Sequence, residues 1–294
     1  MSGYENSESR RRLAQELKLL RSAAGLSTTA LAVPLGVNQS TVSRIERAQK
    51  RATIQDVEAW CAATGADRAK RQELLRLAEE VIVGPRSWAE AGDGGSGDLQ
   101  RVSQDLEGRT GLLSVYQPVS IPGLLQTAAY ARHLLSSGPD GPPPDLAARV
   151  MNRMERQRIL YDEGKRIRFV VPEVALLWPY GPPDDPAVPD EHLEQLARVE
   201  MATRRPNIEL GILPIGPMAI WRLGGFVIHD EIQDDEDPFV HLELLTRPYD
   251  VTDPKGVDLF RRTFDNLMSA AVTGDAARDL IRRTRQKFSQ DRGE

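Results

Sequence analysis

The chain has little of several features that mark particular classes of protein. It contains one cysteine, Cys61, in 294 residues, which excludes an intramolecular disulfide framework. No apolar run approaches the roughly 20 residues that a membrane span needs, and the polar start, residues 1–12, does not have the pattern of a signal peptide. The motifs H-E-x-x-H, G-x-S-x-G and the P-loop are also missing. We therefore expect no enzyme, no cofactor and no membrane partner, and a cytoplasmic location.

Charge is divided unevenly along the chain. The net charge is −5, with 40% hydrophobic and 28% charged residues, a composition typical of globular proteins, and the length leaves room for about two domains. Residues 1–83 have 13 Lys and Arg against 10 Asp and Glu, a net charge of +3. Residues 84–294 have 25 against 33, a net charge of −8. Only the first part therefore has the basic excess that favours contact with nucleic acid.

Apolar residues between positions 13 and 51 fall into three short stripes at helical spacing. The stripes are Leu13, Leu17 and Leu20, then Leu31 and Leu35, then Val42 and Ile45. Two turns separate them, Gly25-Leu26-Ser27 and Gly36-Val37-Asn38, in which Gly can end one helix and Ser or Asn can cap the next. This layout predicts a helix-turn-helix, which places its second helix in the major groove of DNA.

Burial of Val42 and Ile45 would leave a polar face on the helix from Asn38 to Arg47. Side chains on this face suit base edges, because Gln can pair with adenine, Arg with guanine and Ser with either. The predicted base-contacting residues are Gln39, Ser40, Ser43 and Arg44. The residues predicted to contact phosphates are Thr28, Thr41, Arg47, Lys50 and Arg51. Polar side chains are also normal on a surface helix, so a plain scaffold remains the alternative.

The run LRxxxGLS…LA…GVNQSTVSRIE, which ends at Glu46, resembles the Xre or lambda-repressor type of bacterial DNA-binding domain. The resemblance covers roughly residues 10–66. It implies sequence-specific DNA binding and a structural ion pair between Arg21 and Glu46.

Three positions depart from that family's pattern. Thr28 stands where a Gln that contacts phosphate is common, and Ala48 stands near the place where a Gly usually follows the recognition helix. Pro34 falls inside the second helix, where it removes a hydrogen bond and should bend or shorten that helix.

Two further helices, at 53–64 and 67–83, complete an all-α N-terminal domain of five helices that we expect to span residues 1–83. Residues 84–98 are rich in Gly and indicate a linker. This segment contains a literal G-x-G-x-x-G, but no strand precedes it, so a tether is favoured over a nucleotide site.

Residues 99–294 predict a mixed α+β domain, which makes the whole chain α+β. Strands are expected at 112–116 (or a buried turn there), 167–171, 208–213, 226–229 and 239–244. Helices are expected at 124–135, 145–161, 191–203, 257–273 and 276–288. The sheet should be small and mixed.

The run IPGLLQTxxYAR, which begins at Ile121, resembles a domain of unknown function that follows Xre-type helix-turn-helices in antitoxin-like bacterial regulators. The resemblance covers about residues 105–288, and it implies a small partner protein encoded by a neighbouring gene. The candidate residues for a partner or ligand are Gln126, Tyr130, Arg132, Arg153 and Arg156. The alternatives are a turn with an ordinary packing helix, and arginines on a solvated face or in an internal salt bridge.

Two features between residues 229 and 243 stay open. His229-x-Glu231 and His241-x-Glu243 could converge on a metal ion if their strands form a hairpin, although cross-strand polar pairs are the default. The acidic loop between them, Asp234-Asp235-Glu236-Asp237, either solvates the turn or meets a basic protein.

These patterns together predict a sequence-specific transcriptional regulator that binds double-stranded DNA in the bacterial nucleoid. A small helix-turn-helix makes few contacts, so a homodimer on an inverted repeat is expected, with an antitoxin-like role beside a small partner protein. Two alternatives remain: a repressor whose C-terminal domain is a small-molecule pocket, and a protein-binding antitoxin for which DNA binding is secondary.

Overall fold

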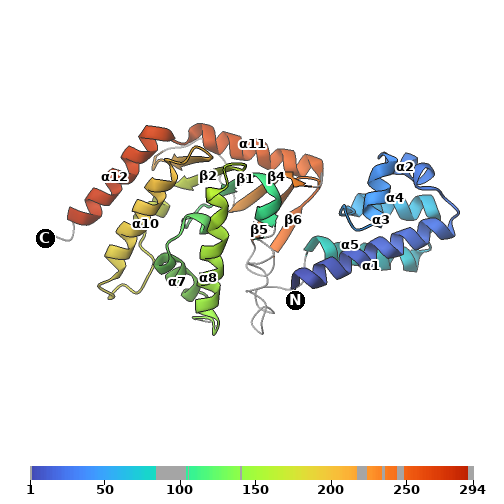
Figure 1. Ribbon diagram of the computed structural model, residues 1–294, viewed down its shortest axis with the longest axis horizontal. Coiled ribbons are helices and arrows are strands. Elements are labelled where there is room, and N and C mark those ends of the chain that lie inside the picture. Colours follow the sequence, from blue (N-terminus) through green and yellow to red (C-terminus); the bar gives the residue numbers. More distant parts are fainter. Residues whose placement is uncertain are drawn as a thin grey trace.

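A computed structural model describes residues 2–83, 104, 106–139, 141–216, 224–233, 236–243 and 248–290. The predicted linker, residues 84–98, lies outside the described residues. The α+β prediction is confirmed, because a helical N-terminal region precedes a region built on one mixed sheet (Figure 1). Among the described helices, none combines the length and apolarity needed to cross a membrane.

Five helices form the N-terminal region around their own core. They are α1 (Ser2–Ala23), α2 (Thr28–Leu35), α3 (Gln39–Glu46), α4 (Ile54–Thr64) and α5 (Arg68–Val83). Trp60 is its largest fully buried side chain, and the indole Nε1 donates a hydrogen bond to the backbone oxygen of Leu17 at 3.0 Å. Leu31, Ile45 and Leu74 pack in the same cluster, so every helix contributes to one core.

Helices α2 and α3 begin at the capping residues that the sequence indicated. The Ser27 and Asn38 side chains accept hydrogen bonds from the backbone nitrogens of Ala30 and Thr41, and each satisfies a donor that a helix start leaves open. Pro34 does lie inside α2, and this helix is only eight residues long.

The end of α3 has an unusual backbone. Ala48 adopts a left-handed conformation, with φ of 55°, which residues other than glycine rarely adopt. The backbone nitrogen of Gln49 donates to the oxygen of Arg44 at 2.8 Å, so this turn closes the helix. An L-residue with a β-carbon is strained there, because its Cβ approaches the following carbonyl.

Replacing Ala48 with glycine should therefore stabilise the N-terminal region by about 1 kcal/mol, because the strain is removed. Urea unfolding followed by circular dichroism measures the change. Ala62, exposed within α4, is the matched control, since glycine at an ordinary helical position should destabilise by about 1 kcal/mol. Destabilisation by both substitutions would contradict the strain at Ala48.

The C-terminal region is built on a six-stranded sheet in the order β3-β2-β1-β4-β5-β6. Its strands are β1 (Thr110–Tyr116), β2 (Arg166–Pro172), β3 (Ile208–Leu213), β4 (Phe226–Ile232), β5 (Phe239–Glu243) and β6 (Pro248–Val251). The pairs among β1, β2 and β3 are parallel, and the remaining pairs are antiparallel, so the sheet is mixed. The sequence did not predict β6.

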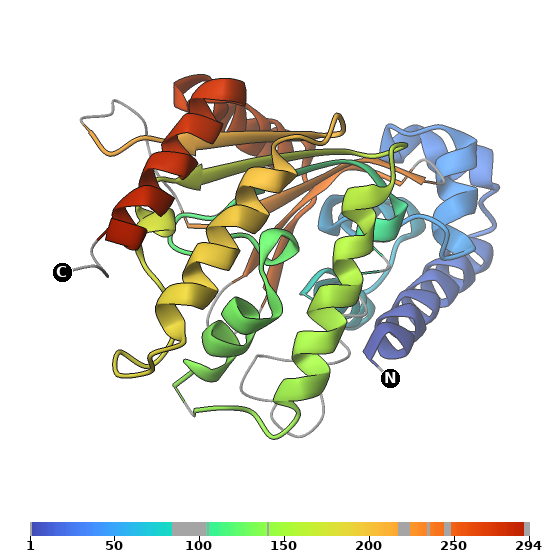
Figure 2. The ribbon, with the colours of Figure 1, turned by 60° about the vertical axis from the view of Figure 1, so that its left-hand side comes forward.

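Helices cover both faces of this sheet. Figure 2 shows α7 (Ala128–Ser136), α8 (Leu146–Arg156) and α10 (Val188–Ala202) over one face, which α12 (Gly274–Gln290) also covers. The other face packs against α11 (Pro254–Ala270). Alternation along β2 supplies both cores: Phe169 and Val171 join the first, and Val170 joins the second.

Some expected helices differ in extent. The helix expected over 124–135 is divided into a 3-10 turn, Gly123–Leu125, and α7, because Thr127 caps α7 through the backbone nitrogen of Tyr130. The helix expected over 145–161 ends as α8 at Arg156 and continues as a 3-10 helix, Gln157–Tyr161. A short helix, α9 (Val174–Leu177), was not predicted.

The two edges of the sheet are treated differently. At the β3 edge, Ile212 and Val272 exchange backbone hydrogen bonds of 2.9 Å in both directions. Gly211 allows this close approach, because a Cβ there would lie 2.8 Å from the Cβ of Ala271. At the opposite edge, β6 lies beside α5 of the N-terminal region.

Candidate nucleic-acid interface

The polar face of α3 points away from the core, because the apolar side of this helix is buried. Val42 and Ile45 are 0% and 2% exposed, which fixes the rotation of the helix. Gln39 and Ser40 are consequently exposed at its start, and Ser43 is half-buried. These side chains lie on one side of a short helix with a capped N-terminus, which is the geometry that a major groove accepts.

Hydrogen bonds order the start of this face. The Gln39 Nε2 donates to the Thr28 Oγ1 at 3.0 Å, which joins the first turns of α3 and α2. The Ser40 hydroxyl donates to the Asn38 Oδ1 at 2.7 Å, and the Thr41 hydroxyl donates to the same oxygen at 2.9 Å. Each of these two groups therefore joins a predicted base-contacting side chain to a predicted phosphate-contacting one, Gln39 to Thr28 and Ser40 to Thr41 through Asn38.

The structure places Arg21 against Glu46, the pair that the resemblance implies. The Arg21 Nη2 donates to the Glu46 Oε2 at 3.0 Å, and Nη1 donates to the backbone oxygen of Leu26 at 2.6 Å. The two side chains are 13% and 6% exposed. One guanidinium thus connects the end of α1, the turn before α2 and the last turn of α3.

The residues predicted to contact phosphates fall into two groups. Arg47 is exposed, and its Nε donates to the backbone oxygen of Ser43 at 3.1 Å. Lys50 and Arg51 instead meet carboxylates of the C-terminal region, at 2.7 Å from Asp237 and 3.1 Å from Asp250. Lys50 and Arg51, which follow α3, are therefore paired with the C-terminal region, whereas Gln39 and Ser40 at the start of α3 are exposed.

Two candidates for partner binding around the IPGLLQT run, Gln126 and Tyr130, are buried. Gln126 is 1% exposed, and its Nε2 donates to the backbone oxygen of Ile121 at 2.7 Å. The Tyr130 hydroxyl accepts a hydrogen bond from the backbone nitrogen of Ile121, and burial raises the pKa of this phenol. Arg132 is exposed on α7. The alternative of a turn with an ordinary packing helix therefore describes Gln126 and Tyr130.

The two arginines of α8 also have internal contacts. The Arg153 Nη1 donates to the Gln126 Oε1 at 2.9 Å, and burial lowers the pKa of Arg153 to about 10. Arg156 pairs with the buried carboxylate of Glu107. The internal salt bridge, the alternative to a ligand clamp, is the arrangement found at Arg156.

The four side chains considered for a metal ion have separate contacts. His229 lies 2.9 Å from the Thr110 hydroxyl, His241 lies 2.8 Å from Asp250, and Glu231 pairs with Arg166. Glu243 is exposed at the end of β5. Within the described part of the chain, no group of three or more His, Cys, Asp or Glu side chains could hold a metal ion. Neighbouring polar groups therefore engage three of the four candidates, His229, His241 and Glu231.

His229 is a neutral structural histidine. Because the Thr110 hydroxyl donates its single hydrogen to the backbone oxygen of Leu106, the His229 Nδ1 must be the donor in its contact with Thr110. Burial lowers the pKa of His229 to about 3. Its ring stacks on Phe239 with centroids 4.7 Å apart, so the imidazole acts as packing as well as a donor.

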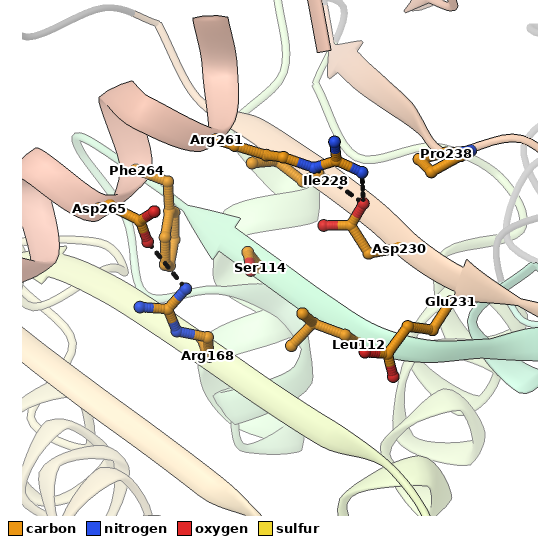
Figure 3. A pocket seen from close by; sticks show the side chains of 10 residues that line it. All are labelled: Leu112, Ser114, Arg168, Ile228, Asp230, Glu231, Pro238, Arg261, Phe264 and Asp265. Carbon is orange, nitrogen blue, oxygen red and sulfur yellow. Dashed lines mark hydrogen bonds and ion pairs between the residues drawn. The ribbon is translucent and has the colours of Figure 1, made fainter. Parts of the chain in front are cut away.

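A trough of about 410 Å³ opens on the α11 face of the sheet (Figure 3). Leu112 and Ser114 of β1 form part of its floor, and Figure 3 shows two ion pairs along it. These join Arg261 to Asp230 and Arg168 to Asp265. The trough therefore offers both signs of charge around an apolar floor.

Sequence reasoning missed the carboxylates that meet the N-terminal region. Glu236 and Asp237 belong to the acidic loop, whose predicted roles were solvation or contact with a basic protein. The Glu236 carboxylate accepts hydrogen bonds from Arg10 and Arg109, at 3.3 and 3.1 Å from its Oε1. The opposite net charges of residues 1–83 and 84–294 were the sequence signal that could have indicated this contact.

Comparisons with known protein families match both regions. A helix-turn-helix domain matches residues 12–74, and a domain of unknown function, DUF5753, matches residues 100–283. No curated protein and no solved structure matches the chain. The first match supports a DNA-binding regulator.

Proposed function

The chain belongs to the DUF5753 family and has a helix-turn-helix domain in front of that domain, and we propose from this that it is a transcriptional regulator that binds specific DNA sequences through α3. The observation that carries the proposal is the polar face of α3, on which Gln39 and Ser40 are exposed and Ser43 and Arg44 are half-buried. Gln39, Ser40, Ser43 and Arg44 would read base edges, and Thr28, Thr41 and Arg47 would contact the backbone beside them.

Dimerisation completes the proposal. One α3 is eight residues long and reaches few base pairs, so we propose a homodimer on an inverted repeat whose half-sites lie roughly 34 Å apart. The C-terminal region would supply the contact between copies and a surface for a small partner protein, in an antitoxin-like role in a bacterial cytoplasm. The chain would have no catalytic role of its own.

One observation favours a second candidate function. The trough in Figure 3 has the size of a small-molecule site, and its two arginines could exchange their carboxylates for those of an anionic ligand. The protein would then be a repressor that a metabolite releases from DNA. Release that depends on added ligand distinguishes this candidate from control by a protein partner.

Selection of bound duplexes from a random-sequence pool tests sequence-specific binding, and Arg44→Ala tests the reading face. A bidentate contact to guanine is worth about 1–3 kcal/mol of discrimination, so Arg44→Ala should reduce preference for the selected site about 5- to 150-fold. Binding to unrelated duplexes should change little. Fluorescence anisotropy with both duplexes measures the ratio.

Arg47→Ala is the matched control for this experiment, since it removes an exposed arginine from the same helix end. It should weaken binding to every duplex by a similar factor and make the salt dependence less steep. An Arg44→Ala protein that loses affinity equally for all sequences would contradict base reading by Arg44.

A further inference from the structure

Three cations of the N-terminal region are held by three carboxylates of the C-terminal region. Arg10 pairs with Glu236 at 3.3 Å, in addition to the pairs of Lys50 with Asp237 and Arg51 with Asp250. We call Glu236, Asp237 and Asp250 the acidic edge. The pairs join residues about 190 or more positions apart in the chain, so they fix how the two regions meet.

The contact at Arg51 is more than a surface ion pair. The carboxylate of Asp250 is 14% exposed and is also bound by the His241 Nδ1 at 2.8 Å. The Arg51 guanidinium lies over the Phe239 ring, 5.5 Å from its centroid, and Phe239 in turn stacks on His229. Burial alone would raise the pKa of Asp250, but the His241 hydrogen bond and the Arg51 charge lower it, so this carboxylate stays charged.

A cleft of about 830 Å³ lies next to these pairs. It is bordered by Thr41, Lys50 and Ile54 on the N-terminal side and by Tyr249 and Val257 on the C-terminal side. Thr41 and Lys50 are among the residues that the sequence predicts to contact DNA phosphates beside α3. The acidic edge therefore pairs with two cations, Lys50 and Arg51, that are predicted to contact the DNA backbone.

Carboxylates bind lysine and arginine with the same charge-assisted hydrogen bonds as phosphate oxygens. We propose that the acidic edge is an intramolecular latch, which holds Arg10, Lys50 and Arg51 in place of DNA phosphates and so lowers the affinity of the regulator for DNA. This inference rests on the proposed function, because it names the regulation of the same α3 surface. DNA binding then requires the two regions to separate at this contact.

Neutralising the acidic edge tests the latch in the full chain. The variant is Glu236→Gln/Asp237→Asn/Asp250→Asn, which keeps side-chain shape and removes three negative charges. The matched control, Glu155→Gln/Asp275→Asn/Asp279→Asn, removes three exposed carboxylates of α8 and α12, each of which pairs with an arginine three positions away. Anisotropy titrations with one selected and one unrelated duplex, at several salt concentrations, give Kd and its salt dependence.

The latch variant should bind both duplexes about tenfold more tightly than the wild type near 0.1 M salt, and the control should change Kd less than about twofold. The slope of log K against log salt should also become steeper by about one to three. Arg10, Lys50 and Arg51, once freed from the carboxylates, would neutralise DNA phosphates and release the counterions bound there. Asp237→Asn alone, at a side chain 55% exposed, should give a smaller tightening without risk to the fold.

The outcomes separate the two ideas. Wild-type binding with an unchanged Kd and slope in both latch variants overturns the latch and leaves the proposed function standing. An equal gain in the charge-matched control also overturns the latch, since long-range charge would then explain the effect. Failure of all the proteins to bind any duplex overturns the proposed function itself.

Discussion

Replacing Trp60 with alanine is expected to destabilise the N-terminal region by about 3–5 kcal/mol. Trp60 is 0% exposed in the core of the five helices, so its removal leaves a cavity that costs stability. The substitution also removes the hydrogen bond from the indole nitrogen to the Leu17 oxygen. A small domain has about 5–15 kcal/mol of stability, so most of it would be lost, and DNA binding with it.

Calorimetry measures this effect, because the transition of the N-terminal region should move down by more than about 12 °C. Trp178 offers the matched control, since its side chain is 54% exposed and Trp178→Ala should leave both regions folded. Far-ultraviolet circular dichroism should still show the strands of the Trp60→Ala protein. A transition that stays at the wild-type temperature would show that Trp60 does not carry the helical core.

Removing Arg21 is the second large effect, expected at about 3–5 kcal/mol for Arg21→Met. The substitution leaves the Glu46 carboxylate, 6% exposed, without the cation that compensates its burial, and it also opens the turn at Leu26. Because Glu46 is the last residue of α3, the reading helix should lose order together with stability. Urea unfolding gives the free energy, and anisotropy gives the loss of DNA affinity.

A double variant distinguishes burial of an unpaired charge from general damage. Arg21→Met/Glu46→Leu should recover much of the lost stability, since no charge then remains buried. Arg71→Met is the matched control, because Arg71 pairs with Glu58 at a surface where both side chains are about half exposed, and it should cost less than about 1 kcal/mol. Equal costs at Arg21 and Arg71 would contradict a buried role for the first pair.

The sequence was most informative where structure is set locally. Ser27 and Asn38 indicated the starts of α2 and α3, because a cap and its helix are only a few residues apart. Spacing of Val42 and Ile45 likewise predicted the outward face of α3. The strand expected over residues 208–213 was placed at the observed bounds of β3.

Other features depend on contacts that a linear pattern does not contain. The four residues of β6 become a strand by pairing with β5, and their sequence, which includes Pro248, gives no strand signal of its own. Gln126 and Arg153 read as polar surface candidates, yet tertiary packing turns them toward each other. The acidic edge was visible as charge, but only the fold shows that it faces Lys50 and Arg51.

The position of β6 beside α5 has a consequence for the C-terminal region when it is separated from the N-terminal region. Backbone donors and acceptors on the outer side of an edge strand are a template for a strand from another molecule. At the β3 edge, Ile212 is already hydrogen-bonded to Val272, which limits pairing with another molecule. The β6 edge instead has α5 of the N-terminal region beside it. Proteolytic removal of the N-terminal region would thus leave a fragment inclined to self-association and aggregation.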